Sequence, residues 1–132
     1  SLPELMAQSD FISLHCPATP ETQKLISKEM LALMKPTACL INTARGAVLD
    51  EDALLEALSE GRIAGAALDV YPNEPHVNPA FLSLSNVILT PHCGSNTQQA
   101  RYEMARQASL RINAVLAGQL PENLLNPEAL NR

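Results

Sequence analysis

Three side chains with complementary chemistry each come shortly after an apolar segment of this 132-residue chain. These residues are Arg45, Glu74 and His92, and the apolar segments before them are 38–44, 63–70 and 86–90. Short apolar runs that end in polar residues are typical of buried parallel strands, and ligands bind outside the carboxyl ends of such strands. A guanidinium, a carboxylate and an imidazole at three strand ends could therefore form an acid–base site for an anionic substrate.

Each residue also has an ordinary structural interpretation when it is taken alone. Arg45 could be a surface arginine at a strand end, and Glu74 could be a solvated loop carboxylate. His92 could end a strand with its ring bonded to a backbone carbonyl, and we expect a structural role for His15, beside Cys16-Pro17. A nucleophilic pair of His92 and Cys93 is not expected, because adjacent side chains on an extended segment point apart.

Strands and helices are expected to alternate along the chain. The expected strands are 11–16, 38–44, 63–70 and 86–90. The expected helix starts are Leu2, Thr19-Pro20, Ser27, Asp50 and Asn96 or Thr97, with the last helix reaching Gly118, and Asn78-Pro79 is expected to open a short turn or helix. This alternation predicts an α/β fold: the second half of a doubly wound, Rossmann-like parallel sheet, with about four strands and flanking helices. The apolar stripe of the last helix, Met104 to Leu116, is expected to serve packing.

Composition excludes several classes of function. The net charge is −5 and no basic run occurs, so nucleic acid and anionic membranes are not expected as partners. No apolar segment approaches the roughly 20 residues that span a membrane. The cysteines are Cys16, Cys39 and Cys93, an odd number without a C-x-x-C pair, which favours reduced thiols in a cytoplasmic protein and no metal site.

Seven spaced blocks of sequence match one known family. They are Asp10-Phe-Ile-Ser-Leu-His-Cys-Pro17, Met34-Lys-Pro36, Ile41-Asn-Thr-Ala-Arg-Gly46, Val48-Leu-Asp50, Ala66-Ala-Leu-Asp-Val-Tyr71, Glu74-Pro75 and Leu89-Thr-Pro-His92. In order, spacing and residue type the chain resembles the D-isomer-specific 2-hydroxyacid dehydrogenases, which include phosphoglycerate, glyoxylate/hydroxypyruvate and D-lactate-type enzymes. The resemblance implies an NAD(P)-dependent oxidoreductase of D-2-hydroxy acids and 2-oxo acids, homodimeric in its full length.

By this resemblance, the family's catalytic residues fall on Arg45, Glu74 and His92. His92 would give or take the proton, Glu74 would orient its ring and favour the charged form, and Arg45 would bind the substrate carboxylate. The resemblance implies NAD as cofactor, with NADP left open, and Asp69 as acceptor for the nicotinamide carboxamide. The implied cofactor contacts are Cys16, Thr43, Ala44, Arg45, Asp69, His92, Cys93, Gly94 and Ser95.

The glycines of this chain do not form a phosphate-binding turn. A nucleotide-binding sheet of this kind ordinarily begins with G-x-G-x-x-G, and the five glycines here contain no such cluster. We therefore expect residues 1–118 to form part of an NAD-binding domain without its glycine-rich first half. Residues 119–132 are expected to be a tail that returns toward a substrate domain, and the chain alone is expected to be inactive.

Two other functions remain open at this point. Some relatives of the family act as dinucleotide-sensing transcriptional corepressors, and an intact arginine, glutamate and histidine does not exclude that role. The chain could also be a half-domain with no activity as it stands. Turnover of a panel of 2-oxo acids would distinguish these possibilities from the dehydrogenase.

Overall fold

The chain separates into two compact units, which we describe one at a time. The first is Ser1–Gly94 and the second is Ser95–Arg132. The computed structural model describes residues 1–120 and 123–127, so part of the expected 119–132 tail lies outside the described residues.

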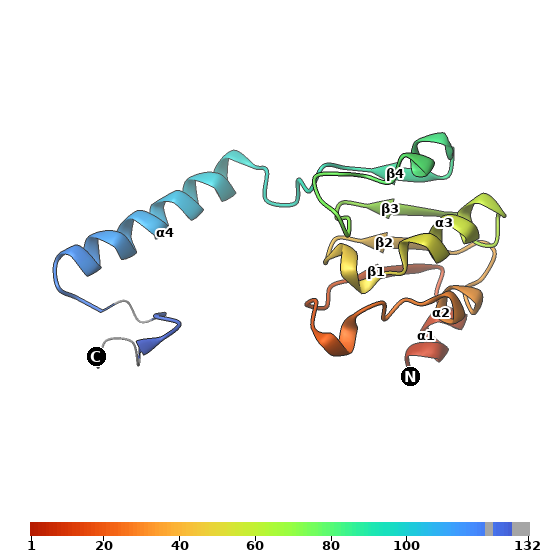
Figure 1. Cartoon of the computed structure of the whole chain (residues 1–132), viewed down its shortest axis with the longest axis horizontal. Coiled ribbons are helices and arrows are strands. Elements are labelled where there is room, and N and C mark those ends of the chain that lie inside the picture. The colour runs from red at the N-terminus through yellow and green to blue at the C-terminus, as the bar shows by residue number, and fades with distance from the viewer. Residues whose placement is uncertain (121–122, 128–132) are drawn as a thin grey trace. The chain divides into compact units, whose positions relative to one another are not determined.

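A parallel sheet of four strands forms the centre of the first unit (Figure 1). The strands are β1 (Phe11–Leu14), β2 (Cys39–Asn42), β3 (Gly65–Leu68) and β4 (Val87–Leu89), and they lie in the order β1-β2-β3-β4. Leu14 pairs with Asn42, Asn42 with Leu68, and Leu68 with Leu89. The expected α/β sheet is thus confirmed, and its four carboxyl ends are level with one another.

Three helices of the first unit begin where the sequence places them. They are α1 (Leu2–Gln8), α2 (Lys28–Ala32) and α3 (Glu51–Ser59). The side chain of Ser27 accepts from the backbone N–H of Met30, and that of Asp50 accepts from the N–H of Ala53 at 3.2 Å. Gly61 follows α3 with a φ of 67°, a left-handed conformation that favours glycine.

The helix expected after Thr19 is only a 3₁₀ turn, Pro20–Thr22. The Thr22 hydroxyl accepts from the backbone N–H of Thr19 at 2.8 Å and donates to the carbonyl of Pro17 at 2.7 Å. Side-chain bonds of this kind satisfy the backbone locally and compete with continuation of a helix. A similar short turn, Pro79–Ser83, follows Asn78, whose side chain accepts from Ala80.

The core of the first unit lies on one face of the sheet. Ile12, Leu14 and Leu40 are buried there together with Leu54 and Leu58 of α3. On the opposite face Phe11 is 73% exposed and Ile88 67% exposed. The residues of β1 accordingly alternate between exposed and buried along the strand. The apolar run did not reveal that one face of this unit is open.

The second unit contains one long helix, α4 (Gln98–Leu116). The Thr97 side chain accepts from the N–H of Ala100, which confirms the expected start, and Gly118 has a φ of 75° just after the end. No residue of α4 is buried, so the expected packing role of its apolar stripe stays a prediction. Within residues 1–120 and 123–127, no helix has both the length and the apolar character needed to cross a bilayer.

Candidate active site

The turn that carries Arg45 is shaped by a buried amide at the end of β2. Asn42 is fully buried, its Oδ1 accepts from the N–H of Ala44 at 3.0 Å, and its Nδ2 donates to the carbonyl of Arg45 at 3.1 Å. A buried polar side chain must find such partners, and here they close the turn. Asn42 was not among the predicted site residues, although a polar residue at the end of an apolar strand is a signal for such a role.

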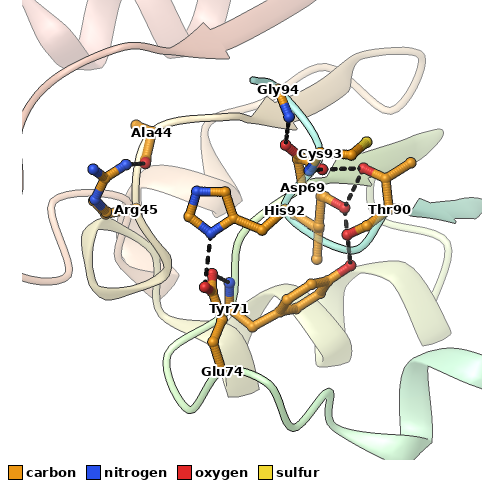
Figure 2. A network of polar contacts seen from close by, with 10 residues as sticks. Ala44, Arg45, Asp69, Tyr71, Glu74, Thr90, His92, Cys93 and Gly94 are labelled. Carbon is orange, nitrogen blue, oxygen red and sulfur yellow. Dashed lines mark hydrogen bonds and ion pairs between the residues drawn. The ribbon is translucent and has the colours of Figure 1, made fainter. Parts of the chain in front are cut away.

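His92 and Glu74 form a direct pair at the carboxyl edge of the sheet. His92 Nδ1 lies 2.7 Å from Glu74 Oε2, and Glu74 Oε1 accepts from the backbone N–H of Tyr71 at 3.0 Å (Figure 2). The bond from His92 and the N–H of Tyr71 hold the pKa of Glu74 below its ordinary value. Both side chains are partly accessible, at 45% and 34% exposure, so a small molecule can reach the pair.

Arg45 completes this group of charged side chains. Its side chain is exposed, and Nη1 donates to the carbonyl of Ala44 at 2.6 Å. Its positive charge also contributes to the lowered pKa of Glu74, after the larger effects of His92 and Tyr71. The structure therefore brings the three expected catalytic side chains to one edge of the sheet, with the His92 ring drawn between Arg45 and Asp69 in Figure 2.

The turn that carries His92 is anchored by Asp69. His92 has a φ of 50°, an uncommon backbone conformation for a residue other than glycine. Asp69 Oδ1 accepts from Thr90 Oγ1 at 2.6 Å and from the N–H of Cys93 at 2.8 Å, while Oδ2 accepts from the N–H of Gly94 at 3.1 Å. These bonds, the one from Thr90 first, lower the pKa of Asp69. The buried carboxylate thus stays charged and fixes the turn next to the site.

A cleft opens between the ends of β1 and β2. It has a volume of about 530 Å³, and its lining residues are His15, Cys16, Pro17, Ala18, Thr43, Ala44 and Arg45. Four of the expected cofactor contacts therefore line one cavity: Cys16, Thr43, Ala44 and Arg45. This volume lies within the range of small-molecule binding sites. His15 Nε2 also lies 2.8 Å from the Ser13 hydroxyl, and because His15 lines the cleft its structural role stays a prediction.

The expected cofactor contacts are thus spread over three places. Asp69 is hydrogen-bonded to Cys93 and Gly94 in the turn that carries His92. The cleft is lined by Cys16, Thr43, Ala44 and Arg45. Ser95 begins the second unit, where it lines a shallow hollow with residues of α4.

The family model, the similar sequences and the similar solved structures all indicate the same protein family. A family model described as "D-isomer specific 2-hydroxyacid dehydrogenase, NAD binding domain" matches residues 1–94. The chain is 51% identical over 126 residues to a glyoxylate reductase of Thermococcus litoralis, a match that covers 96% of this chain and 38% of that relative. The chain therefore spans about two fifths of the length of the curated relatives it matches.

Solved structures agree with the sequence match. A crystal structure of a protein from Thermus thermophilus superposes with a TM-score of 0.89 at 45% identity, over 95% of this chain and 40% of that one. A second is an NADPH-dependent glyoxylate/hydroxypyruvate reductase of Sinorhizobium meliloti in complex with NADP and malonate. Its TM-score is 0.82 at 38% identity, over 86% of this chain and 36% of that one.

Proposed function

This chain belongs to the D-isomer specific 2-hydroxyacid dehydrogenase family, in whose NAD-binding domain it lies, and we propose that its protein reduces small 2-oxo acids to D-2-hydroxy acids with NADH or NADPH. Relatives with this domain use either cofactor. Glyoxylate and hydroxypyruvate are the substrates we propose first, because glyoxylate reductases and glyoxylate/hydroxypyruvate reductases are among the similar proteins.

The contact between His92 and Glu74 carries this proposal. Glu74 Oε2 lies 2.7 Å from His92 Nδ1. Within residues 1–120 and 123–127, no hydrogen bond is found to His92 Nε2. A ring held in this way by a carboxylate presents its other nitrogen to a ligand. In reduction, Nε2–H of His92 donates a proton to the carbonyl oxygen of the oxo acid, and in oxidation neutral Nε2 accepts the hydroxyl proton.

Arg45 would bind the carboxylate of the same substrate. A guanidinium offers several N–H donors in one plane, which matches a carboxylate or an adjacent pair of carboxylate and carbonyl oxygens. One of its nitrogens is bonded to the carbonyl of Ala44, which limits how the side chain can rotate. Binding the carboxylate there would place the carbonyl oxygen of the substrate toward His92.

The cleft and the turn of His92 would hold the nicotinamide end of the cofactor. Cys16, Thr43, Ala44 and Arg45 would form its walls, and Asp69, Cys93 and Gly94 would line the remaining side. When bound, the cofactor supplies the hydride, which no side chain can. Asp69 would add an acceptor for the carboxamide to its structural bonds with the turn.

Replacement of His92 tests this function. The full-length protein should oxidise NADH or NADPH in the presence of glyoxylate or hydroxypyruvate, and His92→Ala should lower turnover by roughly 10²–10⁴-fold. His76→Ala is the matched control, because His76 is an exposed histidine in the same loop as Glu74. Equal turnover in the wild-type and His92→Ala proteins would contradict the proposed role, and an inactive wild type would contradict the function.

Assembly and location belong to the same proposal. We propose a homodimer, to be measured by light scattering of the full-length protein.

A cytoplasmic location is compatible with Cys16, Cys39 and Cys93, which are all free thiols in the structure. Fractionation of the cells that make the protein would test this location.

A further inference from the structure

Tyr71 lies where the three segments that carry Arg45, Glu74 and His92 meet. We propose that Tyr71 is a positioning residue, whose hydroxyl fixes the backbone that presents His92 to Glu74. The inference rests on the proposed function only for its effect on turnover, because the contacts that support it concern the geometry of the pair.

The hydroxyl of Tyr71 joins the ends of two strands. Tyr71 Oη donates to the carbonyl of Leu68 at 3.0 Å, at the end of β3, and to that of Thr90 at 2.9 Å, just after β4 (Figure 2). A phenol has one proton, so the two acceptors share it. The side chain is 6% exposed, and burial raises the pKa of Tyr71 above its ordinary value, so the donor stays protonated at neutral pH.

The carbonyl of Thr90 also supports the backbone of His92. It accepts from the N–H of His92 at 3.1 Å, in a turn where His92 has the uncommon φ of 50°. The Leu68 carbonyl has another donor, the N–H of Thr90 at 2.9 Å. Loss of the Tyr71 hydroxyl would therefore leave the Thr90 carbonyl held only by its own turn, and that turn would be less firmly fixed to β3.

The backbone of Tyr71 is connected to the other two charged residues. Its N–H donates to Glu74 Oε1 at 3.0 Å, so the carboxylate lies between Tyr71 and His92. A Cβ at Gly46, next to Arg45, would overlap the backbone of Tyr71 and Pro72, so the Arg45 turn packs directly on this segment. Only the hydroxyl is removed by Tyr71→Phe, and the ring and these backbone contacts remain.

Tyr71→Phe in the full-length protein is the test, with two readouts. The carboxyl titration of Glu74, followed by ¹³C NMR, should move to higher pH, because the bond from His92 is the largest cause of its lowered pKa. The kcat for a 2-oxo acid should fall roughly tenfold, below the ~100-fold that a misplacement of 1 Å can cost. The KM should change little, because the hydroxyl does not contact Arg45.

Tyr102→Phe is the matched control, since Tyr102 is the other tyrosine of the chain and is 67% exposed. It should change neither readout. An unchanged Glu74 titration in Tyr71→Phe would overturn the inference, even if kcat or the melting temperature fell. A shifted titration with unchanged kcat would support the positioning role and count against the catalytic role proposed for the pair.

Discussion

At Arg45 the shape of the side chain matters as well as its charge. The guanidinium is exposed, and its Nη1 donates a hydrogen bond to the carbonyl of Ala44. This bond restricts the directions in which the other N–H groups of Arg45 can point. A lysine at this position would preserve the positive charge but would lose the planar arrangement of donors.

Arg45→Lys should therefore weaken substrate binding more than it slows turnover. We expect kcat/KM for a 2-oxo acid to fall roughly ten- to hundredfold, mainly through KM, as for the loss of one charged hydrogen bond. Arg101→Lys, an exposed arginine on α4, is the control. Steady-state kinetics with glyoxylate would measure both, and an unchanged KM would argue against a carboxylate-binding role for Arg45.

Glu74 gives a prediction about pH. Its pKa is lowered by the bond from His92 first, so the carboxylate is stabilised in the folded protein. A lowered carboxyl pKa adds stability above the unfolded value, about 4.3, and that stability disappears as the pH falls through the folded value. The pair should accordingly persist to a lower pH than an ordinary glutamate would allow.

Carboxyl NMR of wild type and His92→Ala would check this expectation. Removal of the imidazole should raise the titration midpoint of Glu74 toward the ordinary value for glutamate, whereas His76→Ala should leave it in place. If Glu74 titrated at the same pH in the wild-type and His92→Ala proteins, the contact of 2.7 Å would not persist in solution.

At the scale of elements, the site depends on the close approach of two connecting segments. The 3₁₀ turn Gly46–Val48 follows Arg45 directly, and its first residue touches the backbone that follows β3. Both partners in this contact are backbone, so neither can yield by a change of rotamer.

Gly46→Ala should destabilise the protein by roughly 1–3 kcal/mol or more, because overpacking of a close contact forces the backbone to move. Gly94→Ala is a useful comparison, since a Cβ there would lie 3.5 Å from Asp69 Oδ2, an ordinary contact. Thermal denaturation of the two variants would measure the difference. Equal stabilities would mean that the Arg45 turn does not pack on Tyr71 and Pro72.

The 132 residues together contain the proposed catalytic side chains, but their sequence contains no glycine-rich phosphate-binding turn. The pyrophosphate of a dinucleotide is ordinarily bound by a glycine-rich turn at a helix N-terminus, and no G-x-G-x-x-G occurs in this sequence. The match to relatives likewise covers about two fifths of their length.

Residues 1–132 by themselves should therefore bind NADH weakly and turn over no oxo acid. Isothermal titration of this segment, with the full-length protein beside it, would measure the difference in affinity. β1 lies at one end of the strand order, and a free strand edge invites pairing with another chain, so the segment should also associate. A monomer that bound NADH with micromolar affinity would contradict this expectation.

Features that depend on contacts between neighbouring residues could be predicted from the sequence alone. Alternating apolar runs and polar turns predicted four parallel strands, and Ser27, Asp50 and Thr97 marked helix starts because capping bonds span only three residues. The matching blocks also identified the family and named Arg45, Glu74 and His92 as candidates.

The way those candidate side chains are held depends on contacts between distant segments, which only the folded chain reveals. The bond from Tyr71 to Thr90 joins residues 19 positions apart, and Asp69 reaches a turn more than 20 residues away. Such contacts exist because parallel pairing brings the ends of β3 and β4 to one level, and parallel strands are joined by a long crossover. The open face of the sheet and the close packing of Gly46 on the backbone of Tyr71 and Pro72 also depend on segments that are distant in the sequence.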